Sequence, residues 1–385
     1  MKKAVIVGGS NGIGLAIAKK LIGTGYYVNI VDKSEPDFSL QSVDDQCKFL
    51  QCDLVDFDVS VFDQMAADLD VQLLFITAGY GRVADFEYFH TAEIKRMIEV
   101  NSIASLQIIR KFYHRIKAQK PFYCGVMGSI AGLISSPMFS VYAASKAAVC
   151  RFTESVNAEL SCSKTTNRIL NVSPGSVGGT RFNGGSNQLD MLEPLAEEIL
   201  NQLFSGTELY IPQYETVFRD VIARYQADPV EFGHSSYQYK LESGRTQNEP
   251  KVRIGYLSGT FDLFHIGHLN LLRRAKAECD YLIVGVHPNA SHKGKETFIP
   301  FEERKAIVAS IRYVDKVIES MPEDSDVWEK WHYTKLFVGS DYKGTERFNR
   351  YESFFSDKGV EIVYFPYTQG TSSTQLRERM TKDNS

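Results

Sequence analysis

The feature that most constrains this chain is an apolar strand that runs directly into a glycine-rich turn and a helix, and it occurs twice. The first copy, residues 4–14, reads AVIVGGSNGIG, and the second, residues 252–268, reads VRIGYLSGTFDLFHIGH. Glycines in such a turn let the backbone approach a phosphate, whose charge the helix N-terminus stabilises. The chain is therefore predicted to hold two nucleotide-binding units.

Length and the alternation of elements agree with two units. The chain has 385 residues, which is too long for one ordinary core. Strand and helix patterns alternate in both halves, which predicts parallel sheets covered on both faces. The predicted fold class is α/β, with two doubly wound, Rossmann-like domains in tandem. The domains are expected at 1–241 and 251–385, joined by the polar linker 242–250, which contains Gly and Pro.

Hydrophobic periodicity places the elements within each half. In the first half, strands are expected at 4–7, 28–31, 71–77, 122–127 and 168–172, and helices at 94–117, 140–160 and 192–203. Residues 208–240 are rich in aromatic side chains and are interpreted as irregular. In the second half, strands are expected at 252–257, 281–286, 335–338 and 361–365, with helices from about 268 and over about 301–312.

Composition excludes several function classes. The net charge of −4 provides no basic field for nucleic acid or an anionic membrane. No stretch approaches the ~18 apolar residues of a membrane span, and Gly8-Gly9 interrupts the N-terminal apolar run too early for a signal peptide. The six cysteines form no C-x-x-C pair. We therefore expect a cytoplasmic protein without disulfides that acts on small molecules, with neither nucleic acid nor membrane as partner.

A group of polar residues in the first half has the chemistry of carbonyl reduction. Tyr142 and Lys146 are four residues apart, and hence on one helix face, with Ser129 upstream. A free Tyr, with a pKa near ~10, is a poor acid–base group at neutral pH, and a nearby Lys⁺ is expected to lower that pKa. Ser129 is expected to bind the carbonyl oxygen, and Asn101 to hold a water molecule that links Lys146 to solvent.

These residues resemble the short-chain dehydrogenase/reductase family over about 1–240, through the glycine loop, the Asn101–Ser129–Tyr142–Lys146 tetrad and Pro174-Gly175. The resemblance implies an oxidoreductase with a nicotinamide cofactor and a homo-oligomer. It departs at Thr77, where the family usually has Asn, and at Thr180, which comes one residue late. The implied cofactor-binding residues are Gly8, Ser10, Asn11, Gly12, Ile13, Gly14, Asp32, Asp53, Ala78, Gly79, Tyr142, Lys146, Pro174, Gly175, Val177 and Thr180.

The second strand of the first half bears on the choice of cofactor. Asp32 ends this strand, where a carboxylate can bind the ribose hydroxyls and repel a 2′-phosphate. This favours NAD(H). Lys33 follows directly and keeps NADP(H) open as an alternative.

In the second half, two histidines mark the start of a helix. His265 and His268 are three residues apart and are predicted to stabilise charge on a transferring phosphate. Zinc ligation is the alternative, but no nearby Cys or carboxylate completes a tight cluster. Lys293 and Lys295 are placed to clamp a triphosphate, although a solvated lysine loop is an alternative. The segment 370–374 offers hydroxyls for phosphate oxygens, or is only a helix cap.

Over about 251–385 the chain is similar to the cytidylyltransferase family, most closely the bacterial glycerol-3-phosphate type, through GTFD…HIGH and RYVD. Tyr367 stands where the family's late motif usually has Arg. The resemblance implies CTP with Mg²⁺ as donor, attack of an acceptor phosphate on the α-phosphorus, and release of pyrophosphate. His265, His268 and Lys295 would be catalytic, and no residue is assigned as a metal ligand. The implied CTP-binding residues are Gly259, Thr260, Phe261, His265, His268, Lys295, Arg312, Asp341, Thr371, Ser372, Ser373 and Thr374.

Together the two halves suggest one reaction sequence. A ketose phosphate would be reduced to a polyol phosphate and coupled to CMP, giving a CDP-polyol of the glycerol or ribitol type for surface glycopolymers. In the reverse order, a CDP-ketose would be reduced second. Two alternatives stay open: two independent activities in one chain, or one silent half that senses nucleotides or promotes dimerisation.

Overall fold

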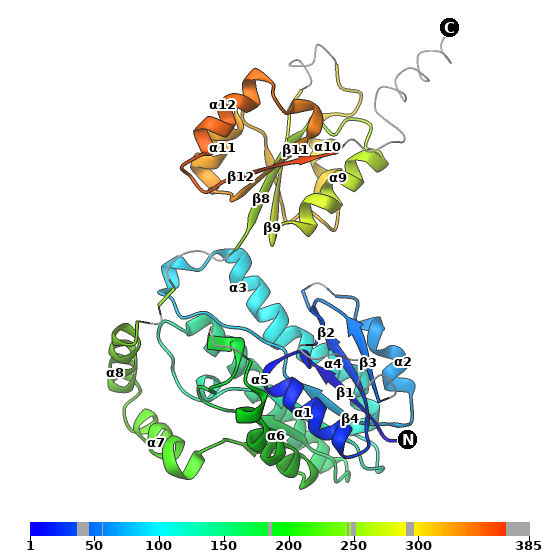
Figure 1. Cartoon of the computed structure of the whole chain (residues 1–385), viewed down its shortest axis with the longest axis vertical. Coiled ribbons are helices and arrows are strands. Elements are labelled where there is room, and N and C mark those ends of the chain that lie inside the picture. Colours follow the sequence, from blue (N-terminus) through cyan, green and yellow to red (C-terminus); the bar gives the residue numbers. More distant parts are fainter. Residues whose placement is uncertain are drawn as a thin grey trace. The chain divides into compact units, whose positions relative to one another are not determined.

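The computed structural model describes the chain except for residues 37–45, 56, 184–186, 245, 248–251, 290–295 and 367–385. It divides into two compact units, Met1–Pro250 and Lys251–Ser385, which are described separately (Figure 1). Each unit is built on one parallel sheet. The predicted fold class, two parallel-sheet α/β domains, is therefore confirmed.

The first sheet has the strand order β3-β2-β1-β4-β5-β6-β7. Its strands are β1 Lys3–Val7, β2 Tyr27–Asp32, β3 Cys47–Gln51, β4 Val71–Ile76, β5 Tyr123–Met127, β6 Ile169–Val172 and β7 Leu209–Tyr210. The order reverses between β1 and β4. In open parallel sheets, ligands bind outside the carboxyl ends of the strands at such a reversal.

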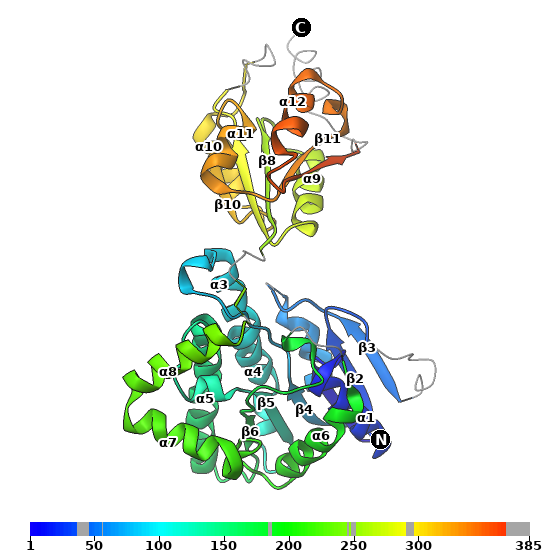
Figure 2. The ribbon, with the colours of Figure 1, turned by 60° about the vertical axis from the view of Figure 1, so that its left-hand side comes forward.

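Helices cover both faces of this sheet (Figures 1 and 2). Helices α1 (Gly12–Gly23) and α6 (Leu189–Phe204) pack on one face, around Ile17, Ile30 and Ile199. Helices α4 (Ala104–Ile116) and α5 (Ser140–Cys162) pack on the other face. Because both faces are covered, the central strands are mostly apolar, and β4 is buried at every residue except Gln72.

The helix expected over 94–117 is present, but a π-helical segment interrupts it. The structure has α3 (Thr91–Ile98), a π-helical segment (Glu99–Ile103) and α4. Asn101 lies in the π-helical segment, and its side chain binds both the N–H and the C=O of Tyr80. A π-helical turn often marks a functional position, and apolar spacing alone does not reveal it.

The prediction that residues 208–240 are irregular is wrong. It contains β7, a π-helical segment (Tyr214–Phe218), α7 (Arg219–Ala227) and α8 (Pro229–Glu242). Asp228 caps α8 by accepting from the N–H groups of Val230 and Glu231, with Pro229 at the first helical position. No residue of α7 or α8 is buried, so these helices lack the apolar stripe from which helices are predicted.

The second sheet has the order β10-β9-β8-β11-β12. Its strands are β8 Ile254–Gly259, β9 Tyr281–Val286, β10 Lys316–Glu319, β11 Lys335–Gly339 and β12 Glu361–Phe365. Helices α9 (Ile266–Ala277) and α10 (Phe301–Ala309) lie on one face, and α11 (Asp324–Trp331) and α12 (Glu346–Phe355) lie on the other (Figure 1). The order again reverses beside β8, the strand that leads to the two histidines.

Candidate functional sites

The glycine loop of the first unit connects β1 to α1 at the point where the strand order reverses. Gly8 has φ +83°, and a Cβ there would lie 2.4 Å from the backbone nitrogen of Ala78. The loop is fixed to β2 because the backbone N–H of Ser10 donates to Oδ2 of Asp32 at 3.0 Å. Asp32 therefore lies directly beside the loop, where a ribose would have to bind.

At the first turn of α1, a side-chain amide oxygen occupies the position that a phosphate oxygen would take. Its residues Asn11, Gly12, Ile13 and Gly14 form the cradle predicted for a pyrophosphate. The backbone N–H of Gly12 donates to Oδ1 of Asn187 at 2.9 Å. A neutral amide oxygen thus takes the position that the helix N-terminus offers to an anion. The residues present fit a dinucleotide, and Asn187 would have to leave when its pyrophosphate binds.

The remaining predicted cofactor positions surround the same sheet edge. Asp53 is exposed two residues beyond β3, and the preceding Cys52 N–H donates to the Asp32 carbonyl at 2.8 Å. Thr180 lies against the cradle, with its methyl 3.7 Å from where a Cβ on Gly12 would be. Val177 lies close to Thr180, since its carbonyl accepts from the Thr180 hydroxyl at 3.1 Å.

Thr77 shows why its departure from the family pattern does not disturb the loop. Its hydroxyl lies 2.9 Å from the Gly8 carbonyl and 3.1 Å from that of Val7, so it ties the end of β4 to the glycine loop. Ala78 follows and donates to Val7 at 3.2 Å. Gly79 comes next, and a Cβ there would lie 3.1 Å from both Oδ1 of Asn101 and Nζ of Lys146.

The structure brings together the tyrosine, serine and lysine of the predicted reductive group. Tyr142 is buried and hydrogen-bonded to Ser129. Nζ of Lys146 lies 5.8 Å from the centroid of the Tyr142 ring and donates to the Met127 carbonyl at 2.8 Å. Ser129 also caps a short helical turn, accepting from the Ala131 N–H at 3.2 Å. One helix, α5, therefore carries both the phenol and the ammonium.

The expected direction of the tyrosine shift is wrong for this state of the protein. Burial raises the pKa of Tyr142 to about 12, although the hydrogen bond with Ser129 acts in the opposite direction. Burial also lowers the pKa of Lys146 to about 8, because the ammonium is itself removed from water. At neutral pH the phenol is therefore protonated, and it is a weaker acid than a free tyrosine.

Asn101 lies beside this group, but its side chain is hydrogen-bonded to other residues of the protein. Its Oδ1 accepts from the Tyr80 N–H at 3.0 Å, and its Nδ2 donates to the Tyr80 carbonyl at 2.8 Å and to Ser145 Oγ at 2.9 Å. These contacts fix the loop after β4. The expected water link to Lys146 is not tested by them and stays a prediction.

Residues after β6 close the other side of the site. The Pro174 carbonyl accepts from the Ile130 N–H at 3.0 Å, which joins this segment to the turn after Ser129. A Cβ on Gly175 would lie 2.2 Å from the Phe218 ring, so a larger residue there would have to displace that aromatic side chain. The site is therefore bounded partly by the segment that sequence patterns did not resolve.

Two phenylalanines next to Tyr142 were missed by sequence reasoning. The Phe139 ring stacks on Tyr142 with centroids 4.2 Å apart, and the Phe182 ring lies 5.3 Å from Tyr142. Phe139 had a usable signal, because it stands three residues before Tyr142 at the start of the same helix. Phe182 had none, since its contact is made across 40 residues of chain.

In the second unit, the two histidines form a cap at the start of α9. Nδ1 of His265 accepts from the Gly267 N–H at 3.0 Å, and Nδ1 of His268 accepts from the His265 N–H at 3.4 Å. Their rings stack with centroids 4.0 Å apart. A neutral imidazole that accepts at Nδ1 carries its proton on Nε2, which is the donor that a phosphate oxygen needs. Burial lowers the pKa of His265, which favours this neutral form.

A fully buried arginine, which sequence reasoning missed, organises the loops around these histidines. Arg304 on α10 donates to the carbonyl oxygens of Thr260, His287 and Pro288. Asp262 has a similar structural role, because it accepts from the backbone N–H groups of residues 298 and 299. Gly259, Thr260 and Phe261 are held next to the start of α9, and the buried Thr260 hydroxyl has no hydrogen-bond partner within the described ranges.

The other predicted CTP-binding residues divide into two groups. Arg312 and Asp341 are exposed, after α10 and after β11 respectively. Lys295, Thr371, Ser372, Ser373 and Thr374, like Lys293 and Tyr367, lie outside the described residues. In the part of the chain that is described, no group of three or more His, Cys, Asp or Glu residues could hold a metal ion.

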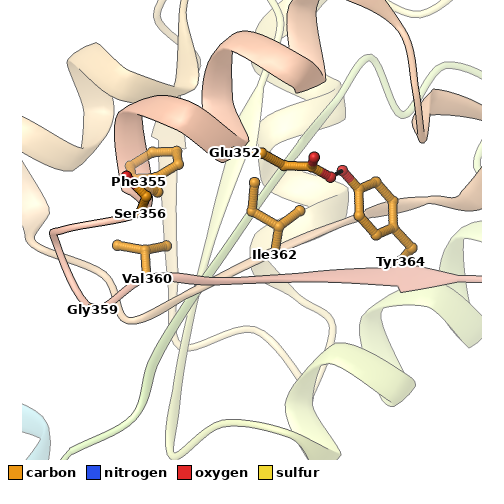
Figure 3. Close-up of a pocket in the computed structure, with 7 residues that line it drawn as sticks. All are labelled: Glu352, Phe355, Ser356, Gly359, Val360, Ile362 and Tyr364. Atoms are coloured by element: carbon orange, nitrogen blue, oxygen red, sulfur yellow. Dashed lines mark hydrogen bonds between the residues drawn. The ribbon is translucent and has the colours of Figure 1, made fainter.

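The hollow in Figure 3 contains none of the predicted CTP-binding residues. It has a volume of about 270 Å³ and lies between α12 and β12, lined by Glu352, Phe355, Ser356, Gly359, Val360, Ile362 and Tyr364. The Tyr364 hydroxyl donates to Glu352 at 2.7 Å, so its main polar groups satisfy each other. None of the residues that line the hollow is positively charged, so it is not suited to bind a nucleotide phosphate.

None of the helices that the structure describes is long and apolar enough to cross a membrane.

Fold and site together define two linked nucleotide-binding domains, one with an oxidoreductase-type site and one with a nucleotidyltransferase-type site. Residues 2–189 match the family model of short chain dehydrogenases, and residues 256–379 match that of cytidylyltransferase-like proteins. The chain belongs to the cytidylyltransferase-like family through its second domain, and this domain is fused to a domain that matches the short-chain dehydrogenase model.

Similar proteins are known for each half. A glycerol-3-phosphate cytidylyltransferase of Bacillus subtilis is 40% identical over 131 residues, which cover 32% of this chain and 92% of that protein. Its counterpart in Staphylococcus aureus is 36% identical over 126 residues, covering 32% and 90%. The crystal structure of a short-chain dehydrogenase from Streptomyces avermitilis matches with a TM-score of 0.50 at 19% identity, covering 63% of this chain and 99% of that one. That last match shows the fold alone.

Proposed function

We propose that the chain is a bifunctional enzyme that reduces a ketose phosphate, or a CDP-ketose, and transfers CMP from CTP to the polyol phosphate, giving a CDP-polyol and pyrophosphate. The observation that carries the proposal is the presence of a complete acid–base group around Tyr142 and a histidine cap at α9 in one chain. A surface glycopolymer is the proposed use of the product, and the cytoplasm the proposed location.

In the reductase, the work of the protein is proton transfer and orientation. A bound nicotinamide cofactor would supply the hydride. Ser129 would hydrogen-bond the substrate carbonyl, and the protonated phenol of Tyr142 would give its proton to the oxygen as negative charge develops there. Lys146, on the same face of α5, would stabilise the phenolate that remains.

NAD(H) is proposed over NADP(H). Asp32 holds the Ser10 N–H on Oδ2 and the Lys33 N–H on Oδ1, so its carboxylate is fixed at the end of β2 beside the glycine loop. A 2′-phosphate would meet this charge. The comparison of kcat/KM for NADH and NADPH tests the choice, and a clear preference for NADPH would mean that Lys33 controls the pocket.

In the transferase, the helix cap supplies the donors. His265 and His268 would hydrogen-bond the phosphate of CTP that is attacked, next to the N-terminus of α9. Arg304 holds the strand-end loop that carries Thr260, which keeps the cradle in place. CTP is expected to arrive with Mg²⁺. Lys295 and the hydroxyls of 371–374 remain proposed phosphate contacts.

The test measures both half-reactions on a panel of ketose phosphates and polyol phosphates. We expect NADH oxidation with at least one ketose phosphate, and pyrophosphate release from CTP with at least one polyol phosphate of the same carbon skeleton. Two active sites without a shared skeleton would support two independent activities. Binding without turnover in one half would support a sensing or dimerising module; the proposed homo-oligomer is tested separately by its mass in solution.

A further inference from the structure

The polar segment 242–250, which the sequence predicts as a linker, is fixed to the first domain at Gln247. The backbone N–H of Gln247 donates to the Val83 carbonyl at 2.7 Å, and its backbone carbonyl accepts from Nη1 of Arg82. Both hydrogen bonds join the main chain of Gln247 to adjacent residues of the loop that follows β4. The segment is therefore attached to the first domain beyond α8, which ends at Glu242.

Arg82 is a buried charge that holds several segments together. Its Nε lies 2.7 Å from Oε1 of Glu93 and its Nη2 lies 2.8 Å from Oε2, so the ion pair is bidentate, and each of the two residues is only 4% exposed. Nη2 also donates to the Tyr88 carbonyl at 2.8 Å, and Cζ lies 4.4 Å from the centroid of the Phe89 ring. A buried guanidinium needs such partners for its charge and its donors, and the Gln247 carbonyl is one of them.

The two residues that precede Arg82 contact the predicted reductive group. The Tyr80 N–H donates to Oδ1 of Asn101 at 3.0 Å, and the Tyr80 carbonyl accepts from Nδ2 at 2.8 Å. Gly81 packs against the Tyr142 ring, since a Cβ there would lie 2.7 Å from Cδ2 of that ring. Three consecutive residues thus contact Asn101, Tyr142 and the predicted linker. Because planar peptide bonds join them, a displacement of Arg82 also displaces Gly81.

We propose that Arg82 is a positioning residue of the reductase, through which the backbone of Gln247 holds the loop beside Tyr142 in place. The inference rests on the proposed reductase activity and deepens it, because it makes part of the predicted linker a support of the reductase site. Arg82 acts through the adjacent Gly81, so loss of its contact with Gln247 should affect turnover. The dinucleotide cradle is formed by a different loop, between β1 and α1, so the affinity for NADH should not change.

The experiment uses the full chain and substitutes Gln247, whose backbone makes both contacts. Gln247→Pro removes the N–H that donates to Val83, whereas Gln247→Ala keeps both backbone groups and is the matched control. Because small misplacements of catalytic groups are costly, Gln247→Pro should lower kcat for reduction of a ketose phosphate by roughly tenfold. The Kd for NADH and the release of pyrophosphate from CTP should not change. Gln247→Ala should match the parent protein in all three measurements.

Hydrogen exchange measures the same coupling without a substrate. The Tyr80 N–H donates to the Asn101 side chain, so its exchange should be slow in the parent protein. Gln247→Pro should speed exchange at Tyr80 by roughly tenfold, because the loop opens more often, and Gln247→Ala should not. Arg82→Lys keeps the positive charge opposite Glu93 but lacks the planar fork that also reaches Gln247, so it should behave like Gln247→Pro.

The outcomes distinguish this inference from the proposed function. If the parent protein reduces no ketose phosphate, the proposed function fails, and faster exchange at Tyr80 in Gln247→Pro but not in Gln247→Ala would still support the coupling. If the parent protein is active and Gln247→Pro matches it in both kcat and exchange at Tyr80, the inference is overturned. Equal losses in Gln247→Pro and Gln247→Ala, or a loss of NADH affinity as large as the loss of kcat, would also overturn it. If Gln247→Pro does not fold, Arg82→Lys decides by the same criteria.

Discussion

At the scale of single residues, the sequence predicts what lies close along one helix and misses what packs across the fold. Tyr142 and Lys146 could be paired from their spacing, because four residues return a helix to the same face. Phe182 and Arg304 could not be found, since their contacts come from distant segments. The pKa of Tyr142 was misjudged because the cost of burying the phenol, which sequence does not show, exceeds the effect of its neighbours.

Tyr142→Phe should abolish reduction. The change removes the proton donor but keeps the ring that stacks on Phe139, so the fold and the dinucleotide cradle should remain. Loss of a general acid typically costs about 10²- to 10⁴-fold in rate. Stopped-flow measurement of NADH oxidation gives the rate, and fluorescence titration gives NADH affinity. Reduction at the parent rate would remove Tyr142 from its proposed role, and pyrophosphate release from CTP serves as the internal control.

The reductase should lose activity as the pH rises through about 8. Burial lowers the pKa of Lys146 to about 8, so its ammonium loses a proton in this range, while Tyr142, with a pKa of about 12, stays protonated. The neutral amine no longer stabilises the developing phenolate. The pH profile of kcat/KM should therefore decline above pH 8. In Lys146→Arg, whose guanidinium stays charged, any remaining activity should show no such decline. A profile that is flat up to pH 10 would contradict this.

His268→Ala should lower kcat of nucleotidyl transfer more than it raises KM for CTP. The histidine caps α9 and is proposed to act on the transferring phosphate, and loss of one preorganised donor costs ~3 kcal/mol, or roughly a hundredfold. His268→Gln, which keeps a polar side chain, should lose less. A variant that is purified with less zinc and recovers activity when zinc is added would instead support metal ligation.

At the scale of elements, predictions succeeded where burial is regular and failed where it is not. The strands β9 and β12 have the predicted bounds, because each is a short apolar or β-branched run between turn residues. The π-helical interruption at Asn101 was not predicted, because it depends on a contact between this side chain and the backbone of Tyr80. Helices α7 and α8 were not predicted, because none of their residues is buried. Asp228-Pro229 is nevertheless a sequence signal for a helix start.

Helix α11 begins with a buried carboxylate that should make the stability of the second domain depend on pH. Burial raises the pKa of Asp324 to about 6, although Arg347 and the Ser258 hydroxyl act in the opposite direction. The usual value is lower, so the folded state holds the proton more tightly. The domain should therefore lose stability as pH rises from about 4 to about 6, by up to ~3 kcal/mol, and stay at the lower value above that.

Asp324→Asn should remove this dependence. The neutral amide costs less to bury, so the variant should gain roughly 1–3 kcal/mol at pH 8 and little at pH 4. Both tryptophans of the chain, Trp328 and Trp331, lie in α11. Tryptophan fluorescence during urea unfolding therefore reports on this domain. Equal destabilisation at both pH values would show that the hydrogen bond from Ser258 outweighs the burial cost.

At the scale of the whole molecule, two patterns near the ends of the chain were enough to predict two parallel-sheet domains. Each sheet reverses its strand order beside the strand that carries its glycine-rich turn, and ligands of open parallel sheets bind at such a reversal. The identity of the substrate was not predictable, because α8 meets the turn of Ser136, which precedes the helix of Tyr142, through contacts that link positions about 100 residues apart.

The central claim is that both domains act on one carbon skeleton. The most direct measurement incubates the full chain with a ketose phosphate, NADH and CTP, and follows the CDP-polyol by mass spectrometry, with each component left out in turn. We predict that at least one ketose phosphate gives the CDP-polyol only when NADH and CTP are both present, and that neither Tyr142→Phe nor His268→Ala forms it at the parent rate. Turnover in both domains without a shared product, whichever step comes first, would contradict the account.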